Sequence, residues 1–140
     1  MLTYRNLTLK ETQNLAAGLA DELRHRGAVI GLIGELGSGK TTFTKAFAKQ
    51  LGIKKITSPT FVTTHEYNIR QGKLYHLDFY RLKKSHELLP IGFSEMRQNK
   101  NLVLVEWVDR FPQIKRQCDI LISLKYREHN KRDVIIQAQN

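Results

Sequence analysis

The sequence predicts a three-layer α/β domain with a mostly parallel central sheet and antiparallel hairpin additions. An apolar run at residues 28–33 is typical of a parallel strand buried on both faces, and a glycine-rich loop and a helical pattern follow it directly. A second apolar run, at residues 102–105, has the same character. Strand patterns on either side of a glycine turn at Gly72 and of a basic turn at residues 127–132 indicate two hairpins.

Length and composition limit the class of protein. The 140 residues suit one domain, so residues 1–140 are expected to form a single unit. The net charge of +10 indicates an anionic partner such as RNA or an acidic protein surface. No aromatic-rich RNA-binding pattern accompanies the basic residues, so the alternative is a generally solvated basic surface. The one cysteine, Cys118, excludes an internal disulfide and is expected to be buried. No apolar run has the length of a signal-peptide core or a membrane span, which predicts a cytoplasmic protein.

The first 27 residues form a predicted strand and helix. Residues 2–7 are expected to be a short edge strand. Thr8 and Glu11 have the spacing of a capping box, so a helix is expected to begin directly after Thr8. The apolar stripe of this helix contains Leu15, Leu19 and Leu23. Gly27 is expected to end the helix ahead of the central strand.

Residues 34–41 read Gly-Glu-Leu-Gly-Ser-Gly-Lys-Thr, which is the spacing of a phosphate-binding loop. In such a loop successive backbone N–H groups face one concavity, the lysine reaches the terminal phosphates and the following hydroxyl binds Mg²⁺. Helical spacing from Thr41 to Leu51 places a helix N-terminus, which attracts anions, behind the loop. A P-loop NTPase-like domain is therefore predicted, with nucleotide phosphates held by Gly34, Glu35, Leu36, Gly37, Ser38, Gly39, Lys40, Thr41 and Thr42.

A loop with two hydroxyl groups follows the phosphate-loop helix. Residues 58–60 read Ser-Pro-Thr, and a hydroxyl here is well placed to sense a γ-phosphate or its metal, as switch loops do. The alternative is an ordinary turn that contains Ser and Thr. We therefore treat Thr60 as a candidate catalytic residue.

The hairpin that comes next ends in an acid. Its strands are predicted at residues 62–69 and 73–80, and Asp78 lies at the end of the second one. A carboxylate at this place is able to hold Mg²⁺ or its water shell; the alternative is a helix N-cap or a partner for Arg81. His76 is expected to be a half-buried strand residue, since neutral imidazole is a poor Mg²⁺ ligand.

The rest of the chain supplies a second acid. Residues 82–100 are polar with a helical pattern broken by proline and glycine, which predicts two short helices without a catalytic role. The apolar run at residues 102–105 then ends in Glu106, the form of a Walker B strand, so Glu106 is a candidate for completing the Mg²⁺ shell or polarising the attacking water. An exposed acid at a strand end is the alternative. Residues 120–125 and 134–137 are expected to form a hairpin that closes one side of the sheet.

Taken together, these segments resemble the bacterial TsaE family, also called YjeE. The family consists of small P-loop ATPases of the pathway that places threonylcarbamoyl on adenosine 37 of certain tRNAs. The resemblance is carried by four motifs in the family's order, namely residues 34–42, Ser58-Pro59-Thr60-Phe61, His76-Leu77-Asp78-Phe79-Tyr80-Arg81 and Val105-Glu106-Trp107.

The resemblance implies ATP and Mg²⁺ as cofactors and a slow hydrolysis of ATP that is coupled to the TsaD and TsaB proteins. It implies that Lys40 neutralises the β- and γ-phosphates, that Thr41 and Glu106 bind Mg²⁺, and that Thr60 and Asp78 serve the γ-phosphate and the water. The roles of Asp78 and Glu106 are exchangeable at this stage, so both are candidate metal ligands. Base-binding residues are not carried over, and residues 8–12 and the basic terminal hairpin are the candidates.

Two other functions share the phosphate loop. A small nucleotide or metabolite kinase needs an acceptor site and an arginine-rich lid, and residues 82–100 make a poor lid with Arg97 as their only arginine. A nucleotide-gated RNA-binding protein is suggested by the net charge. The tRNA is expected to contact this chain indirectly or weakly.

Overall fold

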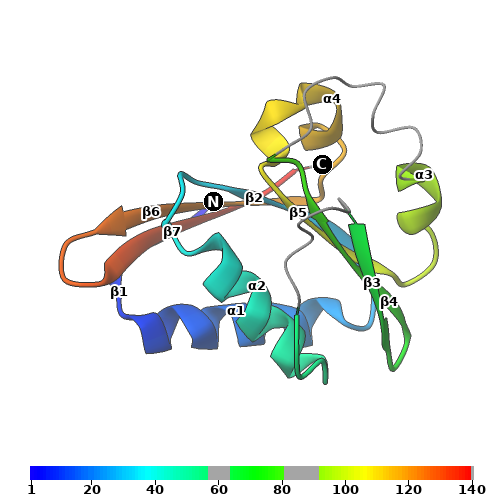
Figure 1. The fold of residues 1–140 in the computed structure, drawn as a ribbon, viewed down its shortest axis with the longest axis horizontal. Helices are drawn as coiled ribbons and strands as arrows, with labels where there is room; N and C mark the ends of the chain where they lie inside the picture. Colours follow the sequence, from blue (N-terminus) through cyan, green and yellow to red (C-terminus); the bar gives the residue numbers. More distant parts are fainter. Residues whose placement is uncertain (57–63, 81–91, 140) are drawn as a thin grey trace.

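The computed structural model describes residues 1–56, 64–80 and 92–139. In these residues a seven-stranded sheet has the order β1-β7-β6-β2-β5-β4-β3. Helices α1 and α2 cover one face, and the short helices α3 and α4 lie on the other (Figure 1), so the predicted three-layer α/β fold is confirmed. The elements are β1 (Leu2–Leu7), α1 (Leu9–Leu23), β2 (Ala28–Ile33), α2 (Lys40–Gln50), β3 (Thr64–Ile69), β4 (Gly72–Asp78), α3 (Phe93–Met96), β5 (Leu102–Glu106), the 3₁₀ helix η2 (Val108–Arg110), α4 (Pro112–Lys115), β6 (Ile120–Arg127) and β7 (Lys131–Ala138).

The centre of the sheet is parallel and its two sides are antiparallel. Strands β6, β2, β5 and β4 run parallel to one another, whereas β7 and β1 on one side and β3 on the other are added by antiparallel pairing. One prediction is wrong in detail. The β6–β7 hairpin forms but does not close its side of the sheet, because β1 pairs outside β7, with Leu2 opposite Ile136. Strand β1 is therefore the edge there, as predicted.

The strands of the central sheet contribute side chains to two apolar layers. In β2, Ile30 and Leu32 pack into the layer beneath α1 and α2, with Phe43 and Phe47 of α2. Val29, on the opposite face, belongs to the layer under α3 and α4. All five residues are at most 3% exposed. Burial on both faces explains why β2 is apolar throughout, as parallel strands in α/β proteins are.

Helix α1 begins with the predicted capping box. The Thr8 hydroxyl accepts from the N–H of Glu11, and the Glu11 carboxylate accepts from the N–H of Thr8 at 2.9 Å. The two reciprocal bonds satisfy backbone donors that the first turn of a helix leaves without partners. The apolar face of the helix then packs on the sheet, and its buried residues are Thr12, Ala16, Leu19, Ala20 and Leu23.

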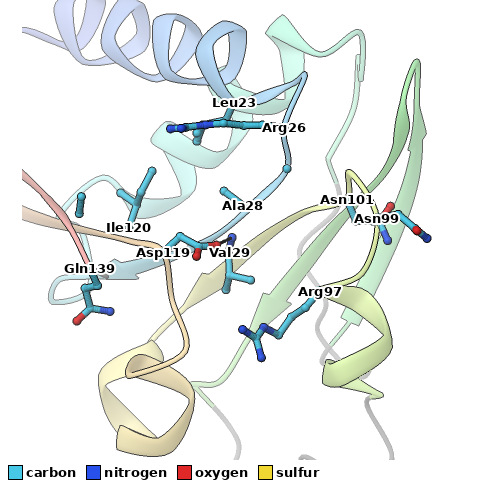
Figure 2. A pocket seen from close by; sticks show the side chains of 12 residues that line it. Leu23, Arg26, Ala28, Val29, Arg97, Asn99, Asn101, Asp119, Ile120 and Gln139 are labelled. Atoms are coloured by element: carbon cyan, nitrogen blue, oxygen red, sulfur yellow. Dashed lines mark hydrogen bonds between the residues drawn. The ribbon is translucent and has the colours of Figure 1, made fainter.

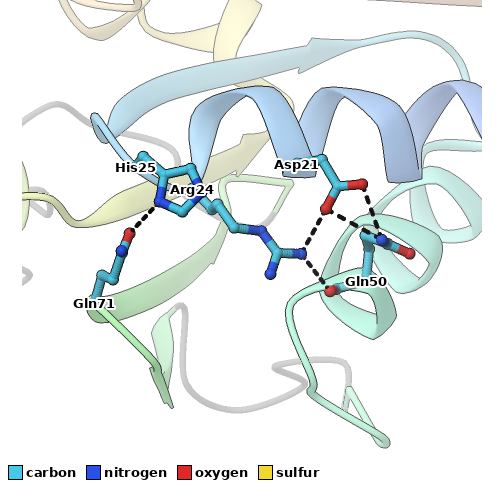
Figure 3. Close-up of polar contacts among 5 residues, drawn as sticks. All are labelled: Asp21, Arg24, His25, Gln50 and Gln71. Carbon is cyan, nitrogen blue, oxygen red and sulfur yellow. Dashed lines mark hydrogen bonds and ion pairs between the residues drawn. The ribbon is translucent and has the colours of Figure 1, made fainter.

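Polar contacts join the ends of α1 and α2 (Figure 3). Arg24 Nη2 donates to Asp21 Oδ1 and to the backbone oxygen of Gln50, each at 2.7 Å. The Gln50 amide donates to the same Asp21 carboxylate at 3.0 and 3.1 Å. The guanidinium thus takes up one of the backbone oxygens that the last turn of α2 leaves without helical partners, and places a positive charge at the negative end of the helix dipole. These contacts hold the C-terminal ends of the two helices together.

Some predicted features lie outside the described residues. These are Ser58, Pro59 and Thr60, the start of the first hairpin strand, and most of the segment for which two short helices are predicted. In the described part of that segment α3 forms as a single turn. No helix in residues 1–56, 64–80 or 92–139 is long and apolar enough to cross a membrane.

Candidate nucleotide-binding site

The predicted site residues meet at one edge of the sheet. The phosphate-binding loop leaves the end of β2, where Leu32 pairs with Glu106 of β5, and Glu106 in turn pairs with Asp78 of β4. The carboxyl ends of parallel strands share an edge, which is where α/β proteins bind ligands. Leu104 and Leu74 on the same strands pack beneath α1 and α2, and side chains two residues apart share a face. Both acids therefore lie on the face from which α2 begins.

Two glycines of the loop are required by geometry. Gly39 has φ +108°, a conformation that other residues resist, and it comes directly before the first turn of α2. A Cβ at Gly34 would lie 2.4 Å from Ser38 Oγ and 2.6 Å from the backbone oxygen of Leu124, so no side chain fits there. The loop is consequently held close against β6.

The Lys40 ammonium group lies inside the curve of the loop. It donates to the backbone oxygens of Gly34 and of Glu35, the latter at 3.0 Å, and its Nζ is 4.0 Å from the centre of the Trp107 ring. Lys40 is 5% exposed. Burial lowers its pKa, and the nearby carboxylate of Glu106 opposes that shift. A cation with so little water around it interacts strongly with an anion that enters the loop.

Glu106 has a buried partner that the sequence analysis did not assign to the site. His76 Nε2 lies 2.5 Å from Glu106 Oε2, and the two side chains are 2% and 6% exposed. His76 is therefore fully buried, so the prediction of half-burial is wrong. The strand pattern indicates that His76 belongs to the site, since it is two residues from Asp78 and shares its face. The sequence does not show that β4 pairs with β5, and this pairing brings Glu106 next to His76.

Asp78 is less enclosed than Glu106. Its Oδ1 accepts from the N–H of Tyr80 at 2.9 Å, which fixes the carboxylate at the end of β4. Partial burial raises the pKa of Asp78, and the neighbouring negative charge of Glu106 adds to that rise. A cation between the two acids would offset both effects.

A cavity of about 480 Å³ connects the loop with the two acids. The predicted site residues that line it are Leu36, Gly37, Gly39, Lys40, Thr41, Thr42, Asp78 and Glu106. Gly34, Glu35 and Ser38 lie on the other side of the loop, where they line a separate cavity of about 320 Å³ with Leu124, Lys125 and Tyr126. Thr60 lies outside the described residues. The first cavity is also lined by Leu9, which lies in the candidate base-binding segment 8–12, and by three residues of the basic terminal hairpin, Tyr126, Asn130 and Arg132. Tyr80 and Trp107 complete its lining.

A larger cavity, of about 540 Å³, lies at the opposite ends of the parallel strands (Figure 2). Its polar side chains serve the fold. Asp119 Oδ2 accepts from the N–H of Val29 at 2.8 Å, Arg97 donates to Gln117 at 2.8 Å, and the Gln139 amide donates to two backbone oxygens at 2.9 Å. This cavity lacks a phosphate loop, so we place the candidate site at the other end of the strands.

Comparison with known proteins identifies the family. Residues 7–134 match the sequence model of the family described as "Threonylcarbamoyl adenosine biosynthesis protein TsaE". The chain belongs to the TsaE family. The tRNA threonylcarbamoyladenosine biosynthesis protein TsaE of Bacillus subtilis is 36% identical over 138 residues, which cover 98% of this chain and 85% of that protein. TsaE of Aquifex aeolicus is 38% identical over 130 residues, covering 91% and 89% of the two chains.

A solved structure is also similar. The crystal structure of YdiB from Bacillus subtilis superposes with a TM-score of 0.77 at 33% sequence identity, and the match covers 99% of this chain and 86% of that one. The similarity extends over almost all of this TsaE-family chain, including both sides of the sheet.

The oxygen donors at the acid end of the cavity suit Mg²⁺. Thr41 offers a hydroxyl, and Asp78 and Glu106 offer carboxylates, which are the ligands that this ion prefers. In residues 1–56, 64–80 and 92–139 no three His, Cys, Asp or Glu side chains are grouped closely enough to enclose a metal ion by themselves. This set fits an ion that is bound by one or two protein oxygens and completed by phosphate and water, as Mg²⁺ commonly is in nucleotide sites.

Proposed function

We propose that this chain binds ATP with Mg²⁺ and hydrolyses it slowly in the cytoplasm, in support of the threonylcarbamoyl modification of adenosine 37 in tRNA. The observation that carries the proposal is the cavity in which a phosphate-binding loop, a buried lysine, a helix N-terminus and two strand-end acids meet. Membership of the TsaE family supports the pathway. The relatives do not favour the kinase alternative.

The chain's own groups account for phosphate binding. The backbone N–H groups at the start of α2 and the Lys40 ammonium supply positive charge at the phosphates. Lys40 now donates to backbone oxygens of the loop, and phosphate oxygens would take over these bonds. Thr41 with Glu106 or Asp78 would hold Mg²⁺, which neutralises charge on the phosphate oxygens when it is bound.

Hydrolysis requires a placed water molecule. The water oxygen bonds to the γ-phosphorus, and the bond from that phosphorus to the β–γ bridging oxygen breaks. ADP and phosphate leave, with one proton of the water on the phosphate and the other released to solvent. Whichever of Asp78 and Glu106 does not bind the metal directly would accept a hydrogen bond from this water. Among the described residues no arginine forms an ion pair with Asp78 or Glu106, and Arg110 instead donates to the backbone oxygen of Tyr80. This supports slow turnover by the chain alone.

We propose TsaD and TsaB as the partners that complete the cycle, as the family resemblance implies. Phosphate release from ATP is expected to be slow for this chain alone and to change at least severalfold when both partners are added. Equal rates with and without the partners would contradict the coupling.

Binding of ATP tests the site itself. In calorimetry with Mg²⁺, Lys40→Ala is expected to weaken ATP binding by about 10- to 100-fold, because charged hydrogen bonds to the phosphates are lost. Lys45→Ala removes the same charge from an exposed position on the same helix and serves as the control. If both variants bind ATP like the unmodified chain, the proposed function is wrong.

A further inference from the structure

Four chain segments meet at the end of the molecule opposite the β6–β7 turn (Figure 1). They are residues 24–27 after α1, 51–55 after α2, 70–73 in the β3–β4 turn and 97–101 before β5. Contacts join them: Arg24 Nη2 donates to the backbone oxygen of Gln50 at 2.7 Å, and His25 Nδ1 lies 3.0 Å from Gln71 Oε1. A Cβ at Gly27 would lie 2.9 Å from the backbone oxygen of Asn101. Side chains of all four segments therefore share one surface.

This surface carries exposed cations that the fold does not use. Two cations of the region are paired, since Arg24 lies 2.7 Å from Asp21 and Lys73 lies 2.9 Å from Glu66. The other exposed Lys and Arg side chains of the four segments form no ion pair within the described ranges. They are Arg26, Lys54, Lys55, Arg70, Arg97 and Lys100, and we call them the basic end. Like charges repel one another, so this concentration of cations indicates an anionic partner.

Two cavities adjoin the turn after α1 within this surface. The first, of about 540 Å³, is lined by Arg26 and Arg97 (Figure 2), and the second, of about 490 Å³, is lined by Arg24 and Arg70. Arg97 gives one N–H to Gln117, which leaves most of its five donors for other acceptors. A guanidinium binds phosphate oxygens through pairs of N–H groups. Each cavity thus offers guanidinium groups to a phosphate.

The acids that line the two cavities already have partners. Asp21 accepts from Arg24 and from the Gln50 amide, and Asp119 accepts from the N–H of Val29 at 2.8 Å. Each cavity therefore has two arginines against one engaged carboxylate. The three lysines of the basic end add further positive charge around the cavities.

The character of the surface favours RNA over an acidic protein. Protein interfaces have an apolar and aromatic core, whereas interfaces with nucleic acid are more polar and more positively charged. Amide side chains, Gln71 and Asn99, line the two cavities and are able to bond to ribose hydroxyls or base edges. In residues 1–56, 64–80 and 92–139 the exposed large apolar side chains all lie outside the four segments. They are Met1, Leu2, Leu9, Leu36, Tyr80 and Tyr126.

We propose that the basic end binds the phosphate backbone of RNA and is the surface through which this chain contacts tRNA. The identification of that RNA as tRNA rests on the proposed function, whereas the surface itself does not depend on ATP. Contacts to phosphates carry no sequence information, so the binding is weak, sensitive to salt and independent of sequence. The competing explanation is that these cations only solvate the surface.

The test is filter binding of a tRNA transcript to the full chain without nucleotide, at about 50 to 200 mM salt. Two double variants remove charge from the basic end, namely Lys54→Gln with Lys55→Gln and Arg26→Gln with Arg70→Gln. Lys125→Gln with Lys131→Gln is the control, because it removes two exposed lysines from the β6–β7 hairpin and changes the net charge equally. Circular dichroism and the melting temperature would show that each variant is folded.

We expect each basic-end double variant to weaken tRNA binding about five- to tenfold at the lowest salt concentration. The slope of the logarithm of the binding constant against the logarithm of salt concentration should become shallower by about 1 to 2, because up to two phosphate contacts are lost. The control should stay within about twofold, since charges more than about 10 Å from the RNA are screened. In calorimetry, both basic-end variants should bind ATP within about twofold of the unmodified chain.

Three results would overturn the inference while leaving the proposed ATP site intact. The first is an equal loss of tRNA binding in the control and in the basic-end variants, which would indicate general basicity. The second is no measurable binding of tRNA by the unmodified chain at the lowest salt concentration. The third is displacement of the chain by polyglutamate as efficiently as by unlabelled tRNA of the same total charge, which would indicate an acidic protein partner. Conversely, a chain that fails to bind ATP but loses tRNA only in the basic-end variants would overturn the proposed ATPase and support this surface.

Discussion

At the scale of single residues, His76 has the most definite consequence for stability. It is the only hydrogen-bond partner that the described residues provide for the buried Glu106 carboxylate. We expect His76→Ala to lower the free energy of unfolding by about 1–3 kcal/mol, because a buried acceptor loses its partner. His76→Gln keeps an N–H donor at the end of a side chain of similar reach and should recover part of that loss. Urea denaturation measures both, and equal stability of His76→Ala and the unmodified chain would contradict the prediction.

Cys118 gives a prediction that depends on pH. The thiol is 3% exposed, and burial raises its pKa from an ordinary value of 9.0 to about 12. The folded chain should therefore resist thiol reagents at pH 8, whereas the chain in urea should react at once. Between pH 9 and pH 12 the unfolded state releases the thiol proton and the folded state keeps it, so the free energy of unfolding should fall as the pH rises. Rapid modification of the folded chain at pH 8 would contradict the buried position.

The site residues that the sequence predicts are those with a local signal. The phosphate loop is contiguous, and Asp78 and Glu106 each end an apolar strand. Arg132, Tyr126 and the contact between His76 and Glu106 depend on which strands are neighbours. A spacing in the sequence does not carry that information, because β7 begins 90 residues after the end of the loop that Arg132 approaches (residue 131 against residue 41). The sequence alone therefore predicts the two acids at one end of the cavity. For the other end it gives only candidate segments, without individual residues.

At the scale of elements, β2 is sensitive to small changes in volume. A Cβ at Gly31 would lie 2.7 Å from Val108 Cγ1, 2.9 Å from Leu121 Cδ2 and 3.0 Å from Cys118 Sγ. We expect Gly31→Ala to lower the free energy of unfolding by about 1–3 kcal/mol, since one methyl group overpacks the layer between β2 and η2.

The opposite result is expected in α1. Gly18 is exposed and nothing lies within 4 Å of the position that its Cβ would take. Gly18→Ala should raise the free energy of unfolding by about 0.5–1 kcal/mol through helix propensity. Urea denaturation of the two variants in parallel tests both statements. A Gly31→Ala chain as stable as Gly18→Ala would contradict the packing of β2.

Helices and strands were predictable where neighbouring residues in the sequence determine them. The capping box fixes the start of α1, the glycine in the turn fixes the β3–β4 hairpin, and double-sided burial marks β2 and β5. The pairing of β1 with β7 was not predictable in this way, because both strands are short amphipathic segments that suit several positions in a sheet.

At the scale of the whole molecule, the net charge of +10 is the property that no single residue explains. This figure already counts acids such as Asp133, which accepts from Arg127 Nε at 2.8 Å. The remaining positive charge should give weak and salt-sensitive binding of tRNA. In filter binding, the logarithm of the apparent binding constant is expected to fall linearly with the logarithm of salt concentration, and binding is expected to be lost by about 0.5 M salt. Tight binding that persists at that concentration would indicate a dedicated tRNA site instead.

The order of the strands also bears on when the cavity is built during synthesis. The phosphate loop is made early, yet its walls come from β5, β6 and β7, which are made last. A ribosome-bound chain that has exposed only its first hundred residues has the loop without Glu106 and without Arg132. The nascent chain is therefore expected to acquire affinity for nucleotide only when its final hairpin has emerged.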